Sequence, residues 1–161
     1  MGFWSIAAIV VVVIVVIVKR LIGEPLNARD LVIPPLVLIG IGVWSLRKIE
    51  LTGLDIAWLA GGSALGLGMG ALRGTTLRLF AKDGVLWQRY TGWTFGVWVL
   101  SIAVNGGFGF LAVAGGMHTD ARPMPLSIGI SLLGEMVVVG LRALRTGVPF
   151  APERKSVLGR R

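Results

Sequence analysis

The sequence predicts an all-α fold, a bundle of five transmembrane helices with the N-terminus outside and the C-terminus in the cytoplasm. Hydrophobic residues make up 55% of the 161 residues and charged residues only 15%, against about 25% charged residues in an average soluble domain. Five apolar runs are long enough to cross about 30 Å of hydrocarbon as helices. Lys and Arg residues collect on alternate sides of these runs. Residues 1–147 are therefore expected to form one transmembrane domain.

The expected spans are residues 3–22, 31–46, 54–72, 91–114 and 125–144. The first has no basic stretch before it and no small-residue cleavage site after it, so we expect an uncleaved span and not a signal peptide. The second is slightly short, and Arg47 and Lys48 can extend it by reaching the interface with their long side chains. Its two prolines, Pro34 and Pro35, fall in the first turns, where a helix tolerates proline best.

The distribution of positive charge predicts the orientation. Thirteen of the 16 Lys and Arg residues fall in the first loop, in the third loop and in the C-terminal region from Arg142 on. The positive-inside tendency places those segments in the cytoplasm, so residues 148–161 are predicted to be a basic cytoplasmic tail. The net charge of +8 favours anionic lipid at the cytoplasmic face as a partner, and not nucleic acid. The expected location is the plasma (inner) membrane of a bacterium.

The third loop carries β-prone runs on both sides of Lys82-Asp83-Gly84. An Asp-Gly pair between such runs favours a two-residue hairpin turn. We expect either a short cytoplasmic β-hairpin between helices three and four, or an extension of these helices into the cytosol. Four basic residues in this loop are predicted to contact lipid or a partner: Arg73, Arg78, Lys82 and Arg89.

Glycines recur at every fourth position in and after the third span. They are Gly62, Gly66, Gly70 and Gly74. Small residues on one helix face let another helix approach closely, which matters where lipid removes the hydrophobic drive between helices. The face is predicted either to pack inside the monomer or to form the interface of a homo-oligomer or of a partner subunit.

Glu135 is the only charged residue near the middle of a predicted span. Ser131, one turn earlier, shares its helix face. A helix rise of about 1.5 Å per residue places Ser63, Asn105 and Glu135 at nearly the same depth. We therefore predict an intramembrane polar cluster of Glu135, Asn105, Ser63 and Ser131.

An ionised carboxylate in hydrocarbon costs roughly 2.5–3.5 kcal/mol on insertion scales, so Glu135 needs a compensating arrangement. It is either protonated, or paired with Arg142 or Arg73, or placed in a wet cavity where it handles a proton or a cation. A structural hydrogen bond to Asn105 or a serine is the alternative to a functional role.

The sequence excludes several kinds of chemistry. The absence of cysteine excludes disulfides, thiolate nucleophiles and iron–sulfur clusters. His118 is the only histidine, and with Asp120 it gives too few ligands for a metal site. No nucleotide-binding glycine motif or Ser-His-Asp set is present. We expect no cofactor, and an enzyme is disfavoured.

The third and fourth spans with their loop resemble the CcdC-like family of small bacterial membrane proteins. The pattern is a glycine-rich span from Gly61-Gly62-Ser63, then Arg73-Gly74-Thr75-Thr76 and Arg78, then Asp83-Gly84 with Trp87 and Arg89, then a span that contains tryptophan. The resemblance implies an association with cytochrome c biogenesis and supplies no catalytic residues. A chain without cysteine cannot itself carry out the thiol–disulfide steps of that process.

The leading functional expectation is a non-enzymatic accessory or assembly subunit of a membrane complex, in contact with another membrane protein or with further copies of itself. The first alternative is a small proton- or cation-coupled transporter or channel with Glu135 as its intramembrane carboxylate. The second alternative, implied by the resemblance, is a membrane protein of cytochrome c biogenesis.

Overall fold

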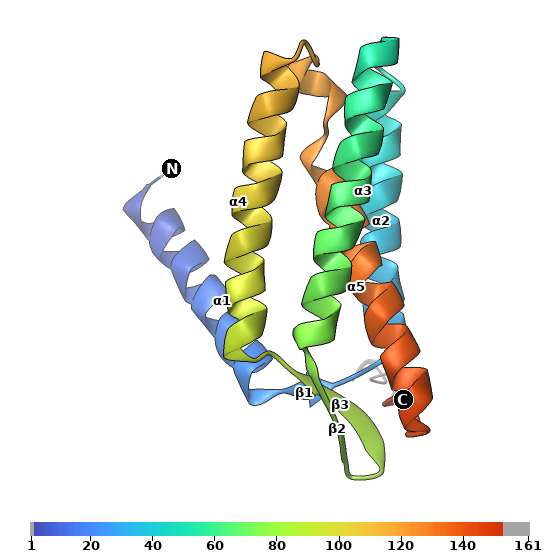
Figure 1. Ribbon diagram of the computed structural model, residues 1–161. Helices are drawn as coiled ribbons and strands as arrows, with labels where there is room; N and C mark the ends of the chain where they lie inside the picture. The colour runs from blue at the N-terminus through green and yellow to red at the C-terminus, as the bar shows by residue number, and fades with distance from the viewer. Residues whose placement is uncertain (1, 153–161) are drawn as a thin grey trace, which may run out of the picture.

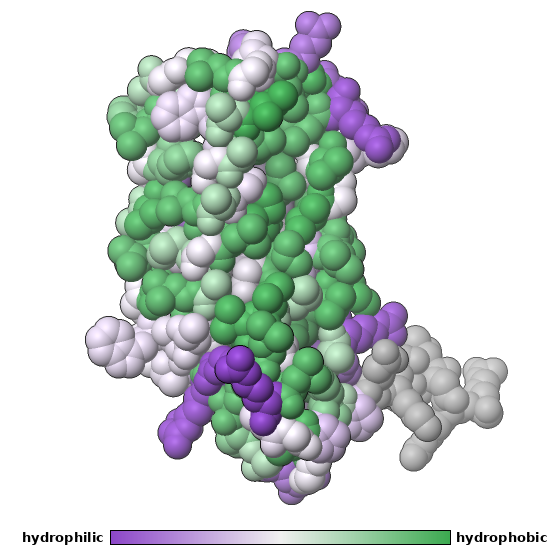
Figure 2. Space-filling model, turned by 45° about the vertical axis from the view of Figure 1, so that its right-hand side comes forward, coloured by the Kyte–Doolittle hydropathy of each residue, from purple (hydrophilic) through white to green (hydrophobic). Residues whose placement is uncertain are grey.

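The computed structural model describes residues 2–152 and consists mainly of helices (Figure 1). The elements, in chain order, are α1 (Phe3–Ile22), β1 (Glu24–Pro25), α2 (Ala28–Leu46), α3 (Gly53–Thr76), β2 (Arg78–Lys82), β3 (Val85–Arg89), α4 (Gly92–Ala114), the 3-10 helix η1 (Thr119–Ala121) and α5 (Met124–Thr146). Among the described residues, four helices are long and apolar enough to cross a membrane: α2, α3, α4, and α5 together with η1. Figure 2 shows apolar side chains over the middle of the visible face and hydrophilic ones toward its two ends.

The helical fold class is therefore confirmed for a protein with four membrane-length helices. The predicted first span corresponds to α1, and its crossing of the membrane stays a prediction, as does the orientation of the bundle. The helices begin and end within a few residues of the expected spans. The largest difference is at α3, which continues to Thr76 and not to residue 72.

Helix α5 lies between α2 and α3, and close backbone contacts hold it there. A Cβ atom on Gly129 would meet the backbone of Ile39 in α2, and one on Gly134 would meet the backbone of Leu67 in α3. Helices α3 and α5 run in the same direction, because successive glycines of α3 face successive turns of α5. Small residues thus replace large apolar contacts where the backbones approach most closely.

Helix α1 stands apart from the other four helices. Figure 1 shows it leaning away from the bundle on the side of α4, and β1 connects it to the rest of the molecule. Of its side chains that the structure describes, all are exposed except Ala7, which is half-buried. The described side chains of this helix are therefore mostly apolar and exposed.

A three-stranded antiparallel sheet in the order β1-β3-β2 closes one end of the bundle, which we call the sheet end. The predicted hairpin between helices three and four is confirmed: Lys82 pairs with Val85 across a two-residue turn. Asp83 and Gly84 both have positive φ, 54° and 76°, as a type I′ turn requires. The short strand β1 was not predicted from the sequence.

The beginning of the predicted tail belongs to the sheet end. The N–H of Leu86 donates to the carbonyl of Pro149 at 2.9 Å, and the N–H of Ala151 donates to the carbonyl of Leu26 at 2.9 Å. A buried apolar cluster lies behind these bonds and consists of Leu26, Leu77, Leu86, Val139 and Ala143. Residues 153–161 of the tail lie outside the described residues.

At the opposite end, Asp55 ties the start of α3 to the loop after α4. Thr52 and Asp55 form a capping box, in which each side chain accepts a hydrogen bond from the backbone N–H of the other residue. Asp55 is fully buried. It also accepts hydrogen bonds from the backbone N–H of His118 at 2.9 Å, and its carboxylate lies 2.8 Å from Nδ1 of that residue.

Helix α5 begins inside the bundle and not at its edge. Arg122 and Pro123 have non-helical backbone angles, and Figure 1 shows this segment descending along the bundle before α5 starts. Leu126 consequently lies beside Gly42, which comes four residues before the last residue of α2. Irregular backbone is tolerated at such depth when protein surrounds it; Ala121, at its start, is fully buried.

Candidate functional site: a buried ion pair between two cavities

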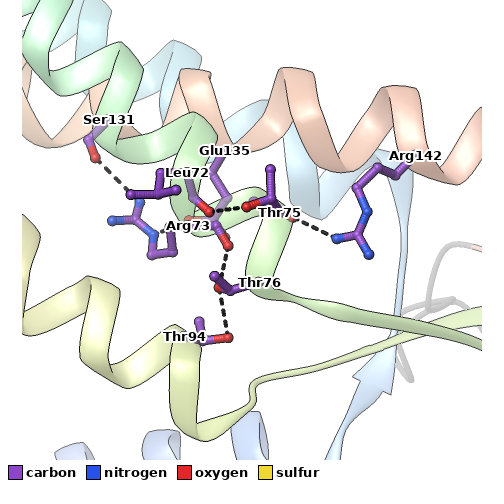
Figure 3. A network of polar contacts seen from close by, with 9 residues as sticks. Leu72, Arg73, Thr75, Thr76, Thr94, Ser131, Glu135 and Arg142 are labelled. Atoms are coloured by element: carbon purple, nitrogen blue, oxygen red, sulfur yellow. Dashed lines mark hydrogen bonds and ion pairs between the residues drawn. The ribbon is translucent and has the colours of Figure 1, made fainter.

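The last turn of α3 and the middle of α5 together form a buried ion pair. Nε of Arg73 donates to Oε2 of Glu135 at 2.5 Å, and the two side chains are only 4% and 10% exposed. A second nitrogen of the same guanidinium lies 3.4 Å from the hydroxyl of Ser131, as Figure 3 shows. The Trp98 ring lies 5.4 Å from the guanidinium carbon, which favours a cation. Of the arrangements expected for Glu135, pairing with Arg73 is the one present.

The glycines of α3 allow the close helix packing on which this ion pair depends. Gly66, Gly70 and Gly74 all face α5, and a Cβ on Gly70 would collide with the backbone of Ser131. The two helices therefore approach closely enough for Arg73 and Glu135 to meet. Gly62 faces the Phe108 ring of α4. The whole glycine face thus packs inside this chain, which is the first of the two alternatives.

Arg73 was predicted to be a loop residue in contact with lipid or a partner, and this prediction is wrong. Helix α3 continues for four residues beyond the expected end of the span, so Arg73 lies on a helix face that points into the bundle. Arg142, the other expected partner of Glu135, donates instead to the carbonyls of Gly74 and Leu77, at 2.7 Å each. These carbonyls belong to the end of α3, where intrahelical donors are lacking.

The other basic residues of the third loop lie on the hairpin. Arg78 and Lys82 are exposed and Arg89 is half-buried. Nζ of Lys82 lies 4.5 Å from the centre of the Trp87 ring. Exposed cations beside an aromatic ring suit an interface with anionic headgroups, so their contact with lipid or a partner stays a prediction.

Glu135 borders a cavity of about 330 Å³ at the sheet end, which we call the acceptor cavity. Its polar lining comes from Asn27, Asp30, Gln88 and Glu135. The two prolines Pro34 and Pro35 also line it. Because proline has no N–H, the carbonyls four residues earlier in α2 have no intrahelical donor. Hydrogen-bond acceptors therefore outnumber donors around this space.

Arg73 borders a second cavity, of about 160 Å³, between α4 and α5. We call it the serine cavity, because Ser101, Ser127 and Ser131 line it together with Asn105; its apolar wall is Trp98, Ile102, Ile128 and Leu132. No carboxylate belongs to this lining. The hydroxyl of Ser101 is buried and has no hydrogen-bond partner among the described residues. The lining thus offers a cation and hydroxyl groups, which are hydrogen-bond donors.

The predicted polar cluster is divided between two levels of the bundle. Glu135 and Ser131 meet at Arg73, level with Gly70 and Gly74. Ser63 lies farther from the sheet end, in a small space that it shares with Arg122 and Ser127. The predicted depths assumed that α5 starts level with α3, whereas the non-helical Arg122–Pro123 segment shifts α5 toward the sheet end.

Asn105 connects the two levels. It lines the serine cavity, and its backbone and side-chain oxygens lie 3.1 and 3.4 Å from the guanidinium of Arg122. Sequence reasoning missed the contributions of Arg122 and Asp30, because both were assigned to loops. Pro123 and Pro125, which flank the first residue of α5, are local signals that a helix begins there.

No three His, Cys, Asp or Glu side chains within residues 2–152 come together as a metal site would require. No protein family, curated protein or solved structure matches this chain. The resemblance of residues 61–107 to the CcdC-like family, and with it the link to cytochrome c biogenesis, stays a prediction.

Proposed function

We propose that this protein is a small proton-coupled membrane transporter in which Glu135 is the proton-binding group. One observation carries the proposal: the buried ion pair lies between two cavities, with Glu135 lining one and Arg73 lining the other. Protonation of Glu135 would remove the negative partner of Arg73 and so break the ion pair that lies between the two cavities. Passage between the cavities would therefore depend on the proton. A carboxylate within the membrane is costly, and such residues are expected to have a function.

A proton fits this site better than a metal cation does. The acceptor cavity has two carboxylates, Asp30 and Glu135, and Arg73 already neutralises the second. Calcium takes about six to eight oxygen ligands and magnesium needs near-octahedral geometry. A proton needs only one carboxylate oxygen and leaves the neighbouring groups in place.

The direction of coupling follows from the distribution of charge. The sheet end has the basic hairpin with Arg78 and Lys82, and the positive-inside tendency favours this end as the cytoplasmic one. The acceptor cavity lies at this end, beside β1 and β3. In the proposal Glu135 exchanges its proton with the cytoplasm through the acceptor cavity.

Reconstituted protein provides the test. Liposomes that contain a pH-sensitive dye are mixed with a panel of small cations, anions and neutral solutes, and proton movement across the membrane is recorded for each. At least one solute should drive proton movement above the level of empty liposomes, and Glu135→Gln should abolish it. Glu50→Gln, which alters an exposed loop carboxylate, should retain it. Proton movement that survives in Glu135→Gln would contradict the proposal.

An accessory or assembly subunit is the second candidate, and α1 favours it. The glycine face is occupied within the chain, whereas the described apolar side chains of α1 are exposed, apart from the half-buried Ala7. A single apolar helix of this kind suits contact with another membrane protein or with a second copy.

Native mass spectrometry of gently extracted protein separates the two candidates. A mass that includes other chains favours the accessory subunit and identifies the partner. For a homo-oligomer, Ala8→Cys in this cysteine-free chain should form a disulfide-linked dimer through α1, and Ala81→Cys on the hairpin should not. A bare monomer without cross-links would speak against the assembly role.

A further inference from the structure

Within the proposed proton-coupled function, on which this inference rests, we propose that the serine cavity binds the co-transported substrate, a small monocarboxylate anion. Arg73 and Ser101 would hold its carboxylate. The proton and the anion would then occupy the two sides of one ion pair, and each would favour binding of the other.

The polar side of the serine cavity matches an anion. Arg73 supplies the positive charge, and Ser101, Ser127 and Ser131 supply hydroxyl donors. The hydroxyl of Ser101 is the decisive group, because Ser101 is only 5% exposed and its oxygen has no hydrogen-bond partner among the described residues. A buried hydroxyl without a partner costs free energy, and an oxygen of a bound carboxylate would satisfy it.

The apolar wall and the volume of the serine cavity indicate the size and character of the non-carboxylate part of the ligand. Trp98, Ile102 and Ile128 give the cavity an apolar side, which a fully hydrated inorganic ion would not use. A cavity of about 160 Å³ has room for a small organic anion and not for a large one. A carboxylate with a chain of two or three carbon atoms fits both the charge and the wall.

Charge balance explains the coupling. In the structure Arg73 and Glu135 neutralise each other. A hydronium ion that arrives through the acceptor cavity gives its proton to the Glu135 carboxylate and leaves as water, and the carboxylate anion then takes the place of Glu135 beside Arg73. The net charge of Arg73, Glu135 and the bound anion together is zero before and after this exchange, so no uncompensated charge remains in a low-dielectric environment. A proton bound without the anion would leave Arg73 unpaired, and an anion bound without the proton would add a second negative charge beside Arg73.

Among the described residues, three other charged groups lie near the site, namely Asp30, Arg142 and Arg122. Besides Arg73 and Glu135 themselves, the charged side chain that lines these two cavities is Asp30 from α2, and β1 and β3 contribute the neutral Pro25 and Gln88. On α5, Arg142 donates to the carbonyls at the end of α3. From the other side, Arg122 reaches Asn105, which lines the serine cavity, and adds positive potential there.

Binding of sodium propionate to the purified full-length protein, measured by titration calorimetry at mildly acidic pH, tests the inference without any transport assay. Propionate should bind, and its neutral analogue propionamide should not. Ser101→Ala should weaken binding about ten-fold, as expected for loss of a hydrogen bond to a charged group. Ser45→Ala is the matched control, because the Ser45 hydroxyl donates to the Ile41 carbonyl of its own helix and Ser45 lines neither cavity; it should leave binding unchanged.

The proton is measured in the same titration in weakly buffered solution that contains a pH indicator. Wild-type protein should take up about one proton for each propionate bound, as linkage requires. Glu135→Gln cannot take up a proton and leaves Arg73 without a counter-charge. It should therefore bind propionate about ten-fold more tightly and without proton uptake, an effect that a merely structural glutamate would not produce.

Several results would overturn the inference. They are equal binding of propionate and propionamide, chloride binding as tight as propionate binding, unchanged affinity in Ser101→Ala, and wild-type binding without proton uptake. If another solute drives proton movement in liposomes while propionate does not bind, the monocarboxylate assignment fails and the transporter stands. If propionate binds as described but no solute drives proton movement, the transporter fails.

Discussion

Arg73 and Glu135 are 62 positions apart in the chain, and their side chains form an ion pair in the interior of the bundle. Removing one partner leaves the other charge buried without compensation, which typically costs about 3–5 kcal/mol. We expect Arg73→Met to lower the free energy of unfolding by about this amount in detergent micelles. The double variant Arg73→Met/Glu135→Leu should recover most of the loss. Additive losses in the double variant would show that the two charges do not interact.

The glycines of α3 differ in what a methyl group would meet. Gly70→Ala places its Cβ against the backbone of Ser131, whereas Gly68→Ala points into open space. The first should destabilise the protein by about 1–3 kcal/mol through overpacking. The second should stabilise it slightly, since alanine favours a helix by about 1 kcal/mol over glycine. Thermal unfolding of both variants in the same detergent checks the difference, and equal midpoints would contradict the helix packing.

The hairpin turn depends on the positive φ of Gly84, 76°. A side chain in the left-handed region costs roughly 1–2 kcal/mol, so Gly84→Ala should loosen the pairing of β2 with β3. Hydrogen exchange at the amides of these strands should accelerate, while exchange in α5 should stay unchanged. Gly96→Ala, at an α4 position with open space around it, is the control and should leave hairpin exchange unaltered.

The predicted orientation can be tested with single cysteines, since the chain has none of its own. Ala81 on the hairpin and Thr119 in η1 are both exposed, and they lie at opposite ends of the bundle. In intact cells a membrane-impermeant maleimide should label Thr119→Cys. It should label Ala81→Cys only after the membrane is permeabilised. The reverse pattern would show that the sheet end faces outward, against the positive-inside tendency.

Local patterns in the sequence predicted the parts of the fold that local physics controls. Apolar runs of sufficient length predicted the helices, and Asp83-Gly84 predicted the hairpin turn. Strand β1 could not be predicted from two residues, Glu24 and Pro25, because only pairing with β3 makes them a strand. The packing of residues 148–152 depends in the same way on distant Leu26 and Leu86.

The candidate site was predictable in its residues more than in its geometry. Glu135 and Ser131 were identified, since a carboxylate in an apolar helix is unusual and the serine shares its face. The pairing with Arg73 could not be placed, because it requires α3 to continue for four residues beyond the expected end of the span at residue 72. The position of Ser63 depended on the non-helical segment at Arg122. Neither feature has a periodic signal in the sequence, because tertiary contacts decide where these helices begin and end.

The hydrogen bonds at Leu86 have a consequence for biosynthesis. Its carbonyl accepts from Leu26, and its N–H donates to Pro149, so the middle strand is completed by one segment made early and by another made late. A ribosome must therefore release nearly the whole chain before the sheet end can close. Until then the N–H of Leu86 lacks the Pro149 carbonyl, and a nascent chain stopped after α5 would leave the apolar cluster around Leu86 without the cover of Val148 and Phe150.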